Sequence, residues 1–238
     1  IKLGCFTIEF VRVNHNIPET NAQAIYTPKG VIFNSSDFKF DHTPAIDKPA
    51  DLAKIARIWT EWVKLYIWDS LGCQKQWRAI SEKEVGHTIE RIVKETDSRI
   101  IVATFASNVW RVIQLINSAI KYNRVVFLSG RSMINNVEIC EHLGYINVPK
   151  WTIRKITNDI ENMPDERVLI LCTGAQWEEF SALARMARGE HAQVTLKKWD
   201  TVLMSSSTIP WNELQASAMM NSLVAKWINL VTNDAMDI

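Results

Sequence analysis

From about residue 98 onward, short apolar runs alternate with longer amphipathic stretches. Continuous apolar runs of four to six residues, rich in β-branched side chains, are typical of strands buried on both faces; they lie at 99–104, 124–129, 167–172, 200–205 and 228–232. The stretches around and between them predict helices at 81–95, 108–122, 134–143, 178–188 and 212–225. Because strands and helices alternate, this part of the chain predicts an α/β fold with a mainly parallel sheet covered by helices.

Residues 1–80 show a different, β-rich pattern. Short strands are predicted at 5–13, 24–27, 31–34 and 65–67, with one helix at 49–58. Pro28-Lys-Gly30 predicts a hairpin-type turn between two of the strands. The change of pattern near residue 80 predicts two domains, at 1–80 and 81–238.

Composition and charge narrow the class of protein. The chain is 47% hydrophobic and 22% charged, as in folded globular proteins. Its net charge of +1 means that any binding to nucleic acid depends on local patches. No apolar run approaches the roughly 20 residues that cross a bilayer, and no leader pattern is present, so a secreted or membrane-spanning protein is not expected. The first residue is Ile1 and not Met, which predicts a piece of a longer protein.

Four predicted strands are followed by loops rich in hydroxyl, amide and glycine groups, at 104–108, 129–133, 173–176 and 205–208. In an open α/β sheet, the ligand crevice lies beyond the carboxyl ends of the strands. Hydroxyls, amides and helix N-termini suit phosphate oxygens. For any one loop, the alternative is that its Ser, Thr and Asn side chains only cap helices. The four loops together predict a groove that binds a polyanion.

Two candidate metal ligands follow strands in the first part of the chain, His15 and Asp37. Imidazole and carboxylate groups are ligands of zinc and of two-metal hydrolytic sites. The spacing leaves open that His15 only caps or packs, and two ligands cannot complete a tetrahedral site. The other histidines, His191 among them, have no ligand spacing and are expected to be surface or structural residues. No GxSxG, HExxH or P-loop motif is present.

Longer motifs then occur in order along essentially the whole chain. They stand at 13–19, 36–41, 81–86, 101–109, 129–133, 181–187, 189–191 and 209–213. In this order they resemble bacterial ribonuclease J, a family in the β-CASP branch of the metallo-β-lactamase superfamily. The resemblance implies that residues 1–80 are the C-terminal part of the first segment of a metallo-β-lactamase αββα domain. It implies a β-CASP domain at 81–238.

The resemblance also implies a function. The full-length protein would hydrolyse RNA phosphodiesters, from the 5′ end or internally, in RNA processing and decay, with two Zn²⁺ per subunit and a metal-activated water. By motif position, His15 would bind a metal, Asp37 would bridge both metals, and Asp69 would be a catalytic acidic residue. The residues implied to contact RNA are Ser107, Asn108, Arg131, Ser132, Gly174 and Gln176. The resemblance also implies that the RNA partner is single-stranded with a 5′-monophosphate end. It further implies that the protein forms homo-oligomers and is located in the cytoplasm.

The chain departs from the family pattern at both ends. The family's HxHxDH motif would precede Ile1, and its last metal-binding histidine would follow Ile238, so two ligands of a full set are expected here. As it stands, the chain should not hold two zinc ions or cut RNA. The alternative is a non-catalytic RNA-binding or scaffold protein that has lost the metal site; a hydrolase of small molecules fits the loops poorly. An HxHxDH motif in the complete gene would support the enzyme.

Tryptophan is unusually abundant and glycine scarce. The ten Trp and eight Gly together are near the usual share of glycine alone, about 7%. Six tryptophans stand where a turn, a helix end or the family pattern favours a small residue, often glycine: Trp68, Trp151, Trp177, Trp199, Trp211 and Trp227. The other four, Trp59, Trp62, Trp77 and Trp110, fit loop or turn positions. We hypothesise that UGA codons encode glycine at these positions in the natural protein. The alternative is a surface rich in Trp that stacks on RNA bases.

Overall fold

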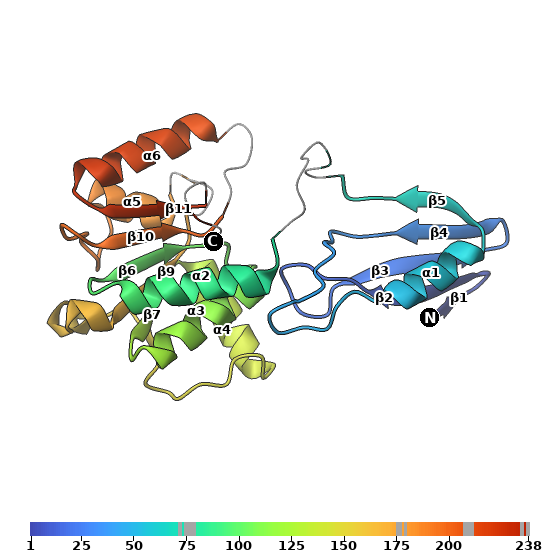
Figure 1. Ribbon diagram of the computed structural model, residues 1–238, viewed down its shortest axis with the longest axis horizontal. Coiled ribbons are helices and arrows are strands. Elements are labelled where there is room, and N and C mark those ends of the chain that lie inside the picture. Colours follow the sequence, from blue (N-terminus) through green and yellow to red (C-terminus); the bar gives the residue numbers. More distant parts are fainter. Residues whose placement is uncertain are drawn as a thin grey trace. The chain divides into compact units, whose positions relative to one another are not determined.

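The chain folds into two compact units, Ile1–Lys83 and Glu84–Ile238, in a computed structural model (Figure 1). The structure describes residues 1–70, 73, 80–174, 178, 180–206, 212–233 and 236. Within these ranges, no helix has both the length and the apolar character needed to cross a membrane.

The first unit is a five-stranded sheet with one helix. Its strands are β1 (Lys2–Leu3), β2 (Phe6–Arg12), β3 (Asn21–Thr27), β4 (Gly30–Asn34) and β5 (Val63–Ile67), in that spatial order. Strands β1 to β4 pair in an antiparallel manner, whereas β5 runs parallel to β4. The parallel pair requires a crossover, which α1 (Leu52–Thr60) supplies. The Asp51 side chain caps this helix by accepting a hydrogen bond from the Lys54 N–H at 3.0 Å.

Successive side chains of a strand point to opposite faces, so this sheet has two different faces. One face forms a core with α1; its buried residues are Val11, Val13, Ala22, Ala24, Val31, Phe33 and Ile58. Cross-strand partners on the other face form a row of Ile8, Ile25, Ile32 and Leu65. These four side chains are only partly buried or exposed. The second sheet of an αββα domain would cover a face of this kind.

The second unit contains a parallel six-stranded sheet, as the alternating pattern predicts. Its strands are β6 (Ile100–Ala103), β7 (Val125–Ser129), β8 (Ile153–Lys155), β9 (Val168–Cys172), β10 (Thr201–Met204) and β11 (Asn229–Thr232). Their spatial order is β11-β10-β6-β9-β7-β8. The helices are α2 (Glu82–Glu95), α3 (Val109–Lys121), α4 (Arg131–His142), α5 (Ala182–Arg188) and α6 (Glu213–Ala225), with short 3-10 turns at Asn158–Asn162 and Asp165–Arg167.

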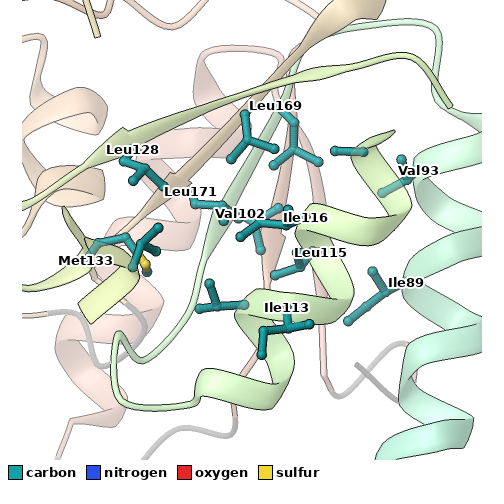
Figure 2. Close-up of a cluster of buried hydrophobic side chains, with 14 of the residues drawn as sticks. Ile89, Val93, Val102, Ile113, Leu115, Ile116, Leu128, Met133, Leu169 and Leu171 are labelled. Atoms are coloured by element: carbon teal, nitrogen blue, oxygen red, sulfur yellow. The ribbon is translucent and has the colours of Figure 1, made fainter. Parts of the chain in front are cut away.

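Helices cover both faces of this sheet. Helices α2, α3 and α4 pack on one face through a core that includes Ile89, Ile116 and Leu171 (Figure 2). Helices α5 and α6 pack on the opposite face, where Leu183 and Leu223 are fully buried. The strand residues contribute alternately to the two cores, which explains why each strand is a continuous apolar run.

The order of the strands fixes where a ligand can bind. From β6 the chain crosses through α3 to β7, on one face of the sheet. From β9, the neighbour of β6, it crosses through α5 to β10, on the other face. The loops that follow β6 and β9 therefore diverge, and a crevice opens between them.

A buried ion pair joins the amino ends of β6 and β10. Arg99 is fully buried and donates to Asp200 through Nε, at 3.0 Å, and through Nη2, at 2.6 Å. Arg99 Nη2 also donates to the Thr195 carbonyl at 2.7 Å, and Asp200 accepts from the Lys197 N–H at 2.7 Å. Burial opposes the charge of Arg99, but the hydrogen bonds and charge of Asp200 outweigh it and raise the pKa of the guanidinium.

The described tryptophans differ in backbone conformation. Trp62, Trp199 and Trp227 have φ of 64°, 72° and 61°, the left-handed region that favours glycine. Half of the six non-glycine residues with positive φ in the described ranges are thus Trp. The prediction of loop or turn positions was wrong for Trp59 and Trp110, which lie inside α1 and α3. Trp77, Trp177 and Trp211 lie outside the described residues.

Candidate functional site

One edge of the five-stranded sheet gathers the three predicted catalytic and metal-binding residues. Strand β2 runs in the same direction as β4 and β5, because β3 is antiparallel to both β2 and β4. His15, Asp37 and Asp69 each follow the carboxyl end of one of these strands.

Hydrogen bonds hold the three segments together at this edge. Asn14 pairs with Lys39 in an antiparallel bridge, where the Lys39 N–H donates to the Asn14 carbonyl at 2.8 Å. The Asp69 N–H donates to Ser35 Oγ at 3.2 Å. The topology thus brings the segments of His15, Asp37 and Asp69 alongside one another.

The side chains at this edge do not form a complete metal site. Across the described ranges, no group of three or more His, Cys, Asp or Glu side chains could hold a metal ion. A structural zinc site needs four protein ligands and a catalytic one usually three. The donors present therefore do not fit a zinc centre by themselves, and the predicted zinc site stays a prediction.

A cationic cavity of about 730 Å³ lies at the carboxyl ends of β7 and β9 in the second unit. Arg131, Lys155 and Arg185 line it, and none of the described lining residues carries a carboxylate. Lys155 forms an ion pair with Glu138 at 3.1 Å, whereas Arg131 and Arg185 form none with any described residue. Unpaired guanidinium groups in a cavity without carboxylates favour an anionic ligand.

A second cavity of about 480 Å³ occupies the crevice between the loops after β6 and β9. Its lining includes the hydroxyl residues Thr104, Ser107, Ser132, Thr173 and Ser181, and one described residue with a carboxylate, Glu178. Ser132, Thr173 and Phe180 line both cavities, so the two adjoin at the carboxyl edge of the sheet. We call the two cavities together the groove.

Two glycines allow the loops of this groove to approach each other. Gly130 has φ of 101°, and a Cβ on it would stand 2.8 Å from Thr173 Oγ1. Gly174 has φ of 124°, and a Cβ on it would stand 2.7 Å from Ser181 Oγ. Both positions therefore require glycine.

The structure places most of the predicted RNA-contacting residues along this groove. Arg131 and Ser132 form the first turn of α4, and Ser107 and Gly174 line the second cavity. Asn108 is buried and caps α3, where its side chain accepts from the Arg111 N–H at 3.2 Å. This is the capping alternative that the sequence left open. Gln176 lies outside the described residues.

His191 contributes to the cationic cavity, although its sequence spacing suggested no special role. Its Nδ1 accepts hydrogen bonds from the N–H groups of Gln193 and Val194, at 3.3 and 3.2 Å. The other ring nitrogen, Nε2, therefore carries the proton of the neutral ring and donates to Ser129 Oγ at 2.9 Å. Burial and the charge of Arg185 lower the pKa of His191, which favours this neutral form.

This arrangement predicts a loss of stability in mild acid. Unfolded His has a pKa of about 6.5, so below that pH the unfolded chain binds more protons at this ring than the folded chain. The free energy of unfolding should therefore fall as the pH falls from about 6.5 through the lowered pKa of folded His191. Urea unfolding at a series of pH values measures the effect, which His191→Gln should reduce and the exposed control His142→Gln should not. Equal pH dependence in all three proteins would contradict the assignment.

Comparison with known proteins gives independent evidence about the family to which the chain is related. A family model described as "Ribonuclease J, beta-CASP domain" matches residues 97–223. Proteins named Ribonuclease J from Helicobacter pylori (strain B128) and Corynebacterium glutamicum are both 40% identical to the chain, over 95% and 96% of its length. A Ribonuclease J from Mycobacterium tuberculosis (strain CDC 1551 / Oshkosh) is 39% identical over 97%. The chain spans only 33%, 32% and 41% of these relatives.

A solved structure shares the fold at low sequence identity. The crystal structure of a protein of unknown function from Enterococcus faecalis V583 matches 98% of this chain and 53% of its own, with a TM-score of 0.67 and 18% identity.

Proposed function

Because the chain belongs to the ribonuclease J family, we propose that it is part of an RNA-hydrolysing enzyme whose second unit holds the RNA strand in the groove along its parallel sheet. The observation that carries this proposal is the cationic cavity. Arg131 and Arg185 lie beside hydroxyl groups, form no ion pair with any described residue, and stand within the residues that the family model matches. RNA presents one negative phosphate per nucleotide, which is the ligand that such a cavity favours.

The proposal includes a catalytic metal centre that the described residues do not complete. His15 and Asp37 each supply one ligand, and the remaining ligands come from other parts of the longer protein. Zinc at such a site supplies Lewis-acid chemistry and a nucleophilic water. The shared edge of the first sheet, where the segments of His15, Asp37 and Asp69 lie side by side, supports this assignment.

Some finer parts of the proposal depend on the resemblance alone. These are single-stranded RNA with a 5′-monophosphate as the substrate, cleavage from the 5′ end or internally in RNA processing and decay, assembly into homo-oligomers, and a cytoplasmic location. They stay predictions.

The groove can be tested by removing its arginines. We expect Arg131→Ala and Arg185→Ala each to weaken binding of a single-stranded RNA 12-mer by the 238-residue chain. Each lost phosphate contact should also reduce the slope of log K against log salt concentration by roughly 0.7. Fluorescence anisotropy at several salt concentrations measures both effects.

Arg188→Ala is the matched control for this test. Arg188 lies on the same helix as Arg185 but pairs with Glu190 at 2.7 Å and does not line the cavity. If Arg188→Ala weakened binding as much as Arg185→Ala, or if the unchanged chain bound no RNA, the proposed groove would be wrong.

The nuclease part of the proposal needs the longer protein. Incubation of that protein with 5′-labelled RNA should give shorter products, and Asp37→Asn should abolish them while RNA binding persists. Binding without cleavage by the unsubstituted protein would instead identify a non-catalytic RNA-binding protein.

A further inference from the structure

Phe180 is a highly exposed aromatic side chain at the centre of the groove. Its residue is 82% exposed, although burial of an aromatic ring is normally favourable. A single exposed apolar residue needs no explanation on a surface, so the position of Phe180 is the informative observation. It lines both the cationic cavity and the hydroxyl-lined cavity and therefore stands where the two meet.

The surroundings of Phe180 match the parts of a nucleotide. Arg131 and Arg185 line the cavity on one side, where they can neutralise phosphates. Thr104 lines the cavity on the other side, is 1% exposed, and its hydroxyl has no hydrogen-bond partner among the described residues. A strand with charged phosphates, hydroxyl-bearing sugars and flat bases combines all the groups that this groove favours.

We propose that Phe180 stacks on one unpaired base of the RNA strand while Arg131 and Arg185 hold neighbouring phosphates. This inference rests on the proposed function and deepens it. Because every base has a π-face, stacking on Phe180 would hold RNA without strong sequence preference. Base pairs inside a duplex are stacked on both faces and cannot present a face to a side chain, so Phe180 would make the groove selective for single strands.

The proposal predicts a large loss of affinity on removal of the ring. Stacking of one base on an aromatic side chain corresponds to about five- to 160-fold in affinity. We expect Phe180→Ala to lose this factor for a single-stranded 12-mer and Phe180→Trp to retain binding. The salt dependence should not change, since no ionic contact is lost. A lowered salt slope is expected only for the arginine variants.

RNA with a single abasic site, moved along the 12-mer, identifies the stacked base. One abasic position should weaken binding by the unchanged chain, and the same position should have no effect on Phe180→Ala. Phe6→Ala removes another exposed phenylalanine, far from the groove in sequence, and should bind like the unchanged chain. Because Phe180 is exposed, Phe180→Ala should unfold at the same urea concentration as the unchanged chain.

The outcomes separate this inference from the proposed function. If the unchanged chain binds RNA but Phe180→Ala binds equally well, or if no abasic position matters, stacking on Phe180 is overturned and the groove stands. If the unchanged chain binds no RNA at any salt concentration, both the groove and the stacking are overturned.

Discussion

Replacing Asp200 with asparagine is expected to lower the free energy of unfolding by about 3–5 kcal/mol. The substitution keeps the shape of the side chain but leaves the fully buried charge of Arg99 without its bidentate partner. The carboxylate of Glu161, 3.5 Å from Arg99 Nη1, is partly exposed and cannot replace two direct hydrogen bonds. Urea unfolding followed by circular dichroism measures the change.

Two further variants show whether the loss comes from the uncompensated charge. Arg188→Gln breaks an exposed ion pair with Glu190 and should cost no more than about 1 kcal/mol. The double variant Arg99→Leu with Asp200→Leu removes both buried charges and should recover much of the stability that Asp200→Asn loses. A double variant as unstable as Asp200→Asn would show that packing at this site, and not charge, determines the loss.

Glycine in place of Trp62, Trp199 and Trp227 is expected to stabilise the chain, although Trp→Gly substitutions normally destabilise proteins. A side chain in the left-handed region costs about 1–2 kcal/mol, and glycine removes this cost. The three indoles are exposed, so few buried contacts are lost. Trp199 and Trp227 contact each other, with ring centroids 6.0 Å apart, so their effects should not be additive. We expect the triple variant to gain about 2–4 kcal/mol in urea unfolding.

Trp59→Gly is the matched control, because Trp59 is helical and its ring lies 5.5 Å from that of Tyr66. Glycine is unfavourable in the interior of a helix, so this variant should have a lower free energy of unfolding. Stabilisation by Trp59→Gly, or destabilisation by the triple variant, would show that the left-handed backbone conformation does not determine the effect of these substitutions.

The hypothesis that these positions encode glycine has its own test. The three left-handed tryptophans support it, since a bulky residue rarely adopts this conformation. Sequencing of the ten codons decides: UGA at all ten supports the hypothesis, whereas UGG at the three left-handed positions would refute it.

Much of the second unit could be predicted from the sequence because its strands are buried on both faces. The runs at 99–104 and 167–172 contain the whole of β6 and β9. Strand β8 escaped prediction because it lies at the edge of the sheet, and only Ile153 of its three residues is apolar. Helix α5 begins later than the predicted residue 178, at Ala182, because Ser181 caps it by accepting from the Ala184 N–H.

The groove was predictable only in part. Ser107 and Arg131 could be predicted as groove residues because they lie in loops that follow strands, and parallel strands bring their carboxyl ends to one edge of the sheet. Arg185 and His191 stand within the motifs at 181–187 and 189–191, but nothing in those motifs indicates that their side chains line a groove. His191 lies 62 residues from its hydrogen-bond partner Ser129. Such residues become recognisable only when the fold brings distant segments together.

The two cores of the second unit lie on opposite faces of one sheet, and their side chains do not mix. Ile116 and Leu223 are separated by the backbone of the strands, so substitutions in one core should add to those in the other. Over evolutionary time, either helical layer could therefore diverge while the other kept its packing. The groove depends on both layers at once, and the loops at its edge would be the slowest part of the domain to change.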